Sequence, residues 1–253
     1  MRKASRSPDA FDVRFLLLDD YPALTRYQGQ PYRHSQGKQR LWDNKDLQSF
    51  TPLRFLPPQE MNYAGTAVVL DPDVFALGDI FELLERDMHG AAVMCCPHDA
   101  KNRRRAGYNS SVMLLDCCKL LHWRWEHQLE QMFAGEFTWR QWAQLELEDA
   151  GTVGILEAVW NHRDKLNTET KLLHNTRRLT QPWKTGLPID FTPKNWHNHP
   201  KVYQPHPDRR QEDFFLSLLR ESIDEGFLDI EFVKVEMEQG HLRRDALKLV
   251  GVS

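Results

Sequence analysis

The chain has 253 residues, of which 41% are hydrophobic and 27% are charged, and its formal net charge is −3. This composition supplies one sizeable core, and its slightly acidic balance argues against non-specific nucleic-acid binding. No apolar run follows the basic opening MRKASR, and no segment approaches the roughly 18 apolar residues of a membrane-spanning helix. The four cysteines form two adjacent pairs without zinc-site spacing. We therefore expect a cytoplasmic protein with reduced thiols.

Apolar runs and helical periodicity predict alternating strands and helices along the chain. Strands are expected at residues 11–18, 66–70, 91–96 and 111–116. Helices are expected at residues 76–88, 119–133, 138–147, 209–225 and 231–249, with a short one near 50–61. The polar stretch 20–50 is predicted to be a long loop with short helical pieces. Alternation of this kind favours an α/β fold with a mostly parallel central sheet.

Two aspartates follow the apolar run VVL at residues 68–70. Asp71 and Asp73 would stand at the carboxyl end of a buried strand, the edge at which open α/β sheets bind ligands. Two carboxylates one residue apart can share a hard divalent cation, and the cation can then hold a diphosphate. An acidic turn with local hydrogen bonds explains the same residues equally well. The Asp-x-Asp pair alone does not decide between the two.

Two classes of enzyme place Asp-x-Asp after an apolar strand. In phosphatases similar to haloacid dehalogenases, the first aspartate is a nucleophile and the second a general acid. Those enzymes also need a later lysine and a further acidic pair at the end of a strand. Asp149 and Asp164 are candidates for that pair, but the sequence around them does not fit the pattern. The other class is the glycosyltransferases that use nucleotide sugars. The segments that follow in the chain favour this second class.

The segment LDPDVFALGDIFELL (70–84) closely resembles the Asp-x-Asp region of GT-A glycosyltransferases of the glycogenin and bacterial galactosyltransferase group, glycosyltransferase family 8. Four more segments resemble that family in the expected order. They are FTPLRFLPPQEMNYAG (50–65), GYNSSVMLLD (107–116), VWNHRDKL (159–166) and TKLLHNTRRLTQPWKTG (170–186). Five ordered motifs are much more specific than any one of them. The resemblance covers roughly residues 50–190.

The resemblance implies a three-layer α/β/α fold of the GT-A type and a metal site. Asp71, Asp73 and His174 would hold Mn²⁺ or Mg²⁺, which would carry the donor diphosphate and act as a Lewis acid. Arg54 would approach the nucleotide or diphosphate. The segment 109–111 (Asn109, Ser110 and Ser111) would offer hydrogen bonds to sugar hydroxyls.

Further positions carry over with departures from the family pattern. Trp160 and Asn161 would contact the sugar or the acceptor, with a core role as the alternative for the tryptophan. The family has a lysine before its Pro-Trp turn, where this chain has Gln181. The missing positive charge would come from Arg177, Arg178 or Lys184.

The amino-terminal segment also departs from the family pattern, because FDVRFLLLDD resembles the second strand unit of the family better than its first. The first strand–helix unit is therefore expected to be absent or replaced, with the nucleobase recognised by the polar segment 20–50. Residues 1–253 would form a single domain, with 191–253 as a loop and helical extension. Apolar positions on the last helices are expected to pack on the core, with self-association into a homo-oligomer as the alternative.

The function that follows is transfer of a hexose from a nucleoside diphosphate sugar, with UDP as the expected nucleotide. The acceptor would be a hydroxyl of a saccharide, lipid or protein, and the reaction would retain anomeric configuration. No side chain can be named as a nucleophile. A non-catalytic protein that binds nucleotide sugars or carbohydrate, and a metal-dependent phosphatase, remain as alternatives.

Overall fold

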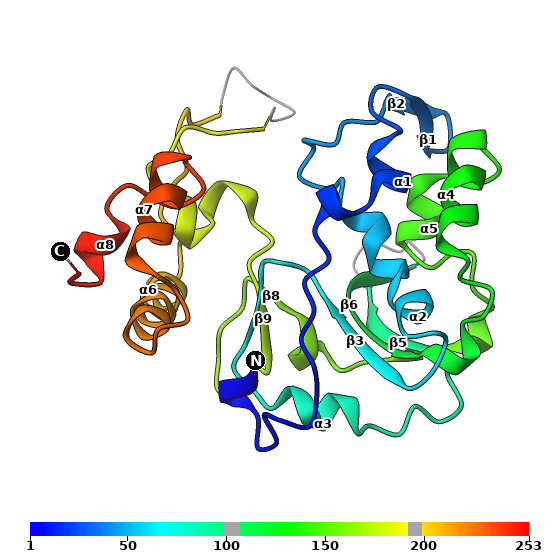
Figure 1. Ribbon diagram of the computed structural model, residues 1–253, viewed down its shortest axis with the longest axis horizontal. Coiled ribbons are helices and arrows are strands. Elements are labelled where there is room, and N and C mark those ends of the chain that lie inside the picture. The colour runs from blue at the N-terminus through cyan, green and yellow to red at the C-terminus, as the bar shows by residue number, and fades with distance from the viewer. Residues whose placement is uncertain (99–106, 192–198, 253) are drawn as a thin grey trace. The chain divides into compact units, whose positions relative to one another are not determined.

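The computed structural model describes residues 1–98, 107–191 and 199–252 (Figure 1). The chain divides into two compact units. One unit contains Met1–His162 and Glu169–His174, and the other contains Arg163–Thr168 and Asn175–Ser253. Within the described ranges, no helix is long and apolar enough to cross a membrane.

A four-stranded sheet lies at the centre of the first unit (Figure 1). Its strands, in spatial order, are β3 (Thr66–Leu70), β6 (Tyr108–Asp116), β5 (Val93–Pro97) and β7 (Val153–Ile155). Strand β6 is antiparallel to both of its neighbours, and only the β5–β7 pair is parallel. The predicted strands at 66–70, 91–96 and 111–116 are therefore present.

The expected mostly parallel sheet is wrong, and the length of one connection explains why. Only residues 98–107 separate the end of β5 from the start of β6. A parallel crossover needs a dozen or more residues, usually including a helix. The chain therefore returns beside β5 in the opposite direction, and the fold is mixed α/β with small mixed sheets.

Both faces of the four-stranded sheet are buried. Along β6, Val112 and Leu114 belong to one apolar cluster while Met113 and Leu115 belong to another, as the two-residue period of a strand requires. Helix α4 (Trp125–Ala134) contributes to the cluster that contains Met113. Helix α3 (Ile80–Leu84) contributes to the cluster that contains Leu114. Burial on both sides explains why these strands are continuous apolar runs.

A second, three-stranded sheet joins segments far apart in the sequence. Its order is β4 (Val74–Ala76), β9 (Leu172–His174) and β8 (His162–Arg163). Strands β4 and β9 are antiparallel, and Val74 lies opposite His174. Strand β4 begins directly after Asp73, and this register brings Val74 beside His174, one hundred positions later in the chain.

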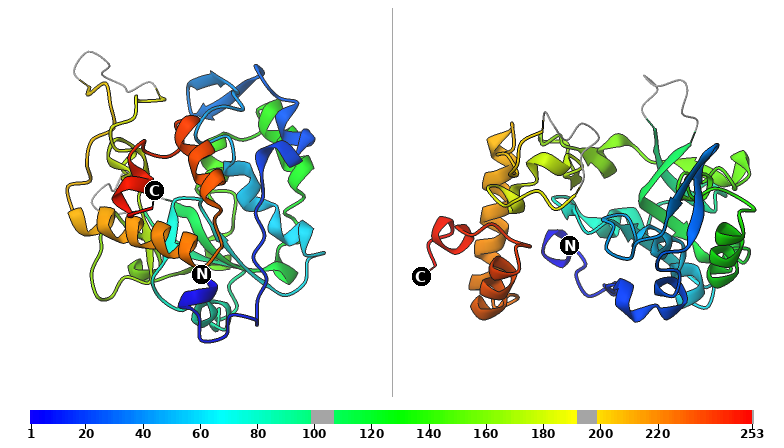
Figure 2. Two further views of the ribbon diagram at one scale, coloured as in Figure 1. Left: turned by 60° about the vertical axis from the view of Figure 1, so that its left-hand side comes forward. Right: turned by 90° about the horizontal axis from the view of Figure 1, so that it is seen from above.

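The polar stretch 20–50 contains more regular structure than expected. It holds α1 (Pro22–Thr25) and a hairpin of β1 (Pro31–Ser35) and β2 (Lys38–Leu41). The hairpin lies beside α4 and the short helix α5 (Trp139–Ala143) in both figures (Figures 1 and 2). A 3₁₀ turn at Thr51–Phe55 then leads into α2 (Pro57–Glu60).

Residues 11–18 do not form the buried strand that the sequence predicts. The stretch is extended and joins neither sheet (Figure 1), and a 3₁₀ turn covers Leu18–Asp20. Phe15 is 83% exposed and Leu17 is 59% exposed. The apolar run was the whole basis of the prediction, but no neighbouring strand in the described part of the chain pairs with it.

The second unit is built around α6 (Arg209–Asp224), α7 (Ile230–Glu238) and α8 (Ala246–Leu249). Leu219, Val233 and Ala246, one residue from each of these helices, are buried in a shared apolar cluster. The predicted helix at 209–225 is confirmed. The predicted helix at 231–249 is two helices, because Gly240 has a φ of +75° and ends the first of them.

A substitution in the apolar run 11–18 should change stability little, and one in the apolar run 111–116 should change it greatly. Phe15→Ser should change the free energy of unfolding by no more than about 0.5 kcal/mol, since this side chain is mostly in water. Leu114→Ala should cost about 2 to 5 kcal/mol, because Leu114 is fully buried. Urea denaturation of the purified variants measures both. A large loss for Phe15→Ser would contradict the exposed placement of this side chain.

Candidate metal centre

Asp71 and Asp73 lie where the chain leaves one sheet and enters the other. Strand β3 ends at Leu70, and the Asp71 N–H donates to the Ser111 carbonyl on β6 at 3.0 Å. The Asp71 carbonyl accepts from Val74 N–H at 3.2 Å, which turns the chain into β4. The turn expected from Asp-Pro-Asp is therefore present. It also presents both carboxylates beside His174, the residue opposite Val74.

The three side chains predicted to bind metal converge. One ligand atom from each of Asp71, Asp73 and His174 lies within 4.8 Å of the others. His174 Nε2 is 3.1 Å from Asp73 Oδ1. Within the residues that the structure describes, this is the one cluster of three or more acidic, histidine or cysteine side chains with that geometry. Two carboxylates and one imidazole suit a divalent cation such as Mn²⁺ or Mg²⁺.

Asp71 is already paired with a cation of the protein itself. Arg54 Nε and Nη2 donate to the two Asp71 oxygens at 2.8 and 2.6 Å, and Arg54 Nη1 donates to Ser110 Oγ at 2.9 Å. Burial raises the pKa of Asp71 above its ordinary value, and the Arg54 guanidinium opposes that rise. Arg54 is thus placed at the predicted site, but its partner is the first aspartate of the motif.

The other residues predicted at the donor sugar have partners within the first unit. Asn109 Nδ2 donates to the Pro97 carbonyl at 3.0 Å, and Ser110 Oγ donates to the Ala143 carbonyl at 2.7 Å. Ser111 Oγ accepts from Asn161 Nδ2 at 3.0 Å. Ser110 and Ser111 thereby connect β6 to the cluster, because Ser110 contacts Arg54 beside Asp71 and Ser111 contacts Asn161 beside His174.

Trp160 is fully buried, and so has no ring face open to a ligand. It packs among apolar side chains, and the Lys171 ammonium lies 4.7 Å from its ring centroid. Asn161, its neighbour in sequence, reaches the metal cluster instead, since Asn161 Oδ1 lies 2.8 Å from His174 Nδ1. The Trp-Asn motif therefore combines a core residue and a site residue.

The three cations predicted to replace the missing lysine belong to the second unit. The Arg177 guanidinium Nε lies 3.9 Å from Asp164 Oδ2, and the Arg178 guanidinium lies 5.6 Å from the Phe191 ring centroid. Lys184 Nζ donates to Asp190 at 2.5 Å. Each thus has a partner of its own within that unit.

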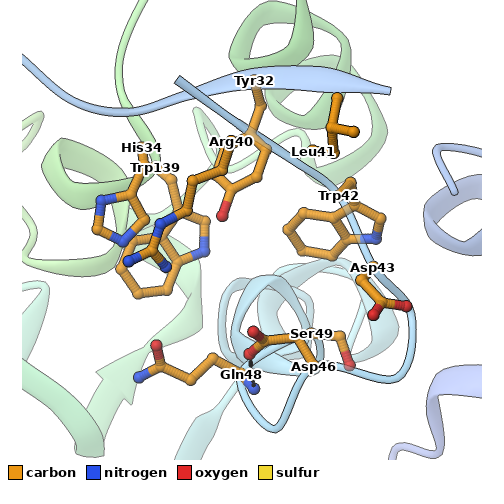
Figure 3. A pocket seen from close by; sticks show the side chains of 10 residues that line it. All are labelled: Tyr32, His34, Arg40, Leu41, Trp42, Asp43, Asp46, Gln48, Ser49 and Trp139. Carbon is orange, nitrogen blue, oxygen red and sulfur yellow. Dashed lines mark hydrogen bonds between the residues drawn. The ribbon is translucent and has the colours of Figure 1, made fainter. Parts of the chain in front are cut away.

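A pocket that the sequence did not predict lies beneath the β1–β2 hairpin. Figure 3 shows His34, Arg40 and Trp139 grouped on one side and Trp42 on the other, with the Tyr32 hydroxyl directed inward. Further side chains from residues 41–49 complete its lining: Leu41, Asp43, Asp46, Gln48 and Ser49. The His34 and Trp139 rings stack at 5.1 Å between centroids. The turn residues SQGK between two alternating segments could have predicted the hairpin, and with it the pocket.

No family model and no curated protein matches this sequence. Solved structures give matches at low identity. The chain is 12% identical to the galactosyltransferase LgtC, solved in complex with donor and acceptor sugar analogues, over 78% of this chain and 82% of that one, with a TM-score of 0.43. Mouse xyloside xylosyltransferase 1 is 17% identical over 63% and 72% of the two chains, with a TM-score of 0.37.

The glycosyltransferase GlyE of Streptococcus pneumoniae is 18% identical to this chain, with a TM-score of 0.43. That match covers 53% of this chain, and the chain spans only 38% of the GlyE structure. The structural neighbours of the chain are thus GT-A glycosyltransferases.

The pairing of Arg54 with Asp71 predicts a large stability change. Arg54→Met should lower the free energy of unfolding by about 3 to 5 kcal/mol at neutral pH, because it leaves a buried carboxylate without its cation. Adding Asp71→Asn to that variant should recover part of the loss. Denaturant titrations of wild type, both single variants and the double variant measure the coupling. Additive losses would contradict the pairing.

The lowered pKa of His34 predicts that the stability of the protein depends on pH. Burial, reinforced by the positive charges of Arg40 and Lys38, lowers the pKa of His34 to about 4. The folded state therefore favours the neutral ring. The stabilisation that comes from this preference for the neutral ring is complete above the unfolded pKa of about 6.5. It is lost as the pH falls toward the folded pKa of about 4. His34→Phe keeps an aromatic ring against Trp139 but cannot titrate. Urea denaturation at pH 7.5 and 4.5 should show a smaller pH-dependent loss for the variant, and equal losses would contradict this.

Proposed function

We propose that this chain is a metal-dependent glycosyltransferase that moves a hexose from a UDP-linked donor to a hydroxyl acceptor. The observation that carries the proposal is the convergence of Asp71 and Asp73 with His174, which lies far from both in the sequence. The ordered motifs of the GT-A resemblance name the same three residues. Support therefore comes from the sequence and from the geometry independently.

The three side chains fit a divalent cation by their chemistry. Asp71 and Asp73 offer carboxylate oxygens, and the hydrogen bond of His174 Nδ1 to Asn161 leaves Nε2 facing Asp73. Bound Mn²⁺ or Mg²⁺ would supply Lewis-acid stabilisation of the charge that develops on the departing diphosphate. Arg54 would add a second positive charge beside the diphosphate, since its guanidinium lies on Asp71.

Other parts of the chain are proposed to hold the remaining donor groups. Asn109 and Ser110, at the start of β6, would face the hexose hydroxyls. Arg177, Arg178 and Lys184 are proposed to supply positive charge for the diphosphate in place of the lysine that the family motif has.

The hairpin pocket is proposed to take the nucleobase. Its aromatic walls suit a planar ring, and Gln48 and Asp46 offer hydrogen bonds. Helix α5 connects this pocket to the metal site, because Trp139 lines the pocket and the Ala143 carbonyl accepts from Ser110. Trp139 and Ala143 lie about 6 Å apart along the axis of this helix.

Retention of configuration is part of the proposal and does not require a side-chain nucleophile. The acceptor hydroxyl would attack from the face that the diphosphate leaves, and the departing phosphate oxygen would take its proton. The protein would then act by holding both substrates in place and by stabilising charge.

One observation favours a second candidate, a non-catalytic protein that binds nucleotide sugars. Both Asp71 oxygens accept hydrogen bonds from Arg54, so the carboxylate is neutralised without a metal. The phosphatase hypothesis requires a lysine beside Asp71. The cation that the structure pairs with this carboxylate is an arginine, which disfavours that hypothesis.

The proposal predicts metal-dependent turnover. Purified protein should release UDP from UDP-glucose or UDP-galactose when Mn²⁺ is present. Asp71→Asn, Asp73→Asn and His174→Ala should each lower the rate on the order of 100-fold or more, because each removes a ligand. Asp79→Asn is the matched control. Asp79 caps α3 through Phe81 N–H outside the metal cluster, and asparagine caps helices equally well.

The outcomes separate the candidates. Binding of UDP-hexose and Mn²⁺ with no UDP release under any acceptor tested would support the non-catalytic alternative. Hydrolysis of a phosphomonoester that Asp71→Asn abolishes would support the phosphatase. Failure to bind either Mn²⁺ or any UDP-hexose, measured by calorimetry, would overturn both the transferase and the binding protein.

A further inference from the structure

His174 has a different partner at each ring nitrogen. Its Nδ1 lies 2.8 Å from Asn161 Oδ1, and its Nε2 lies 3.1 Å from Asp73 Oδ1. His174 is 6% exposed and Asn161 is 5% exposed, so water is largely excluded from the contact between these two residues. Asn161 therefore sets the orientation of the imidazole at Nδ1, and Nε2 faces the Asp73 carboxylate.

The amide of Asn161 is itself held in one direction. Its Nδ2 donates to Ser111 Oγ at 3.0 Å, which directs the amide oxygen toward His174. Ser111 also accepts from the Asp71 N–H through its own carbonyl at 3.0 Å. One residue of β6 thus contacts the backbone of the first aspartate and, through Asn161, the histidine.

A metal ligand must offer a lone pair, and a neutral imidazole has only one. If the proton is on Nδ1, Nε2 is free to bind a cation beside Asp73. If the proton is on Nε2, the ring presents a donor to the cation and cannot bind it. An acceptor fixed at Nδ1 selects the first arrangement, and groups that do so commonly change metal affinity 10- to 100-fold when removed.

We propose that Asn161, oriented by Ser111, is a positioning residue that fixes the tautomer and ring direction of His174 for metal binding. The inference rests on the metal site of the proposed function. It gives Asn161 and Ser111 a role different from the direct sugar contacts that the family resemblance implies. Their amide and hydroxyl groups are turned toward each other and toward His174.

A purely structural role makes a different prediction. A buried amide with two hydrogen bonds stabilises the fold wherever it lies, and its loss would then lower stability without a specific effect on metal affinity. A comparable buried hydrogen bond involves no member of the cluster, since Thr170 Oγ1 lies 2.8 Å from His162 Nδ1. That pair offers a matched control, because it also joins a neutral side chain to a histidine Nδ1.

The experiment measures Mn²⁺ affinity by electron paramagnetic resonance of free Mn²⁺, with thermal unfolding followed in parallel. Asn161→Leu keeps the size of the side chain and removes the acceptor, and should weaken Mn²⁺ binding about 10- to 100-fold. Asn161→Asp keeps an acceptor oxygen and should bind Mn²⁺ at least as tightly as wild type. Thr170→Val should change Mn²⁺ affinity less than about 3-fold, whatever its effect on stability.

Ser111→Ala provides a second test that leaves Asn161 in place. It removes the hydroxyl that orients the amide and should weaken Mn²⁺ binding by a smaller factor than Asn161→Leu. It answers the question even if Asn161→Leu does not fold. Wild-type Mn²⁺ affinity in both Asn161→Leu and Ser111→Ala would overturn the inference while leaving the metal site intact. Absence of Mn²⁺ binding by the wild-type protein would overturn the proposed function and this inference together.

Discussion

The first unit depends on a single strand inserted against the direction of its neighbours. Strand β6 is nine residues long, lies between β3 and β5, and is buried on both faces. Its apolar half holds the two core clusters together. Its polar residues Asn109 to Ser111 lie near the start of the strand, where Ser110 and Ser111 are buried and hydrogen-bonded. The same strand therefore supplies the core and the walls of the site.

The polar half of β6 organises the site through ordinary hydrogen bonds. Ser110 holds Arg54, which neutralises Asp71, and Ser111 holds Asn161, which orients His174. A buried charge or amide is costly unless its partners are in place. The site is thus stable only when every one of these groups is paired, and such pairing gives the side chains a fixed geometry before any ligand arrives.

The sequence predicted those parts of the molecule that depend on local pattern or on an ordered motif. Residues 66–70 read as a strand because five apolar or β-branched residues stand together, and Asp71, Asp73 and His174 came from the family motifs. Strand direction could not be predicted, because it depends on the length of the connection between β5 and β6 and on which strands become neighbours. Residues 11–18 have the composition of a buried strand, and only the absence of a partner among the described strands reveals otherwise.

The hydrogen-bond partners of the predicted side chains also could not be predicted from the sequence. Arg54 and Asn161 were both assigned to the ligand, yet their hydrogen bonds are to Asp71 and His174. The sum of the charges at the site explains what the contact between Arg54 and Asp71 achieves. Asp71, Asp73 and Arg54 sum to one negative charge, which favours a cation over an anion. A bound divalent cation would make the sum positive by one, and a diphosphate would then be attracted. Arg54 thus stabilises the buried Asp71 carboxylate beside Asp73 before a cation binds, and afterwards leaves the positive charge that attracts a diphosphate.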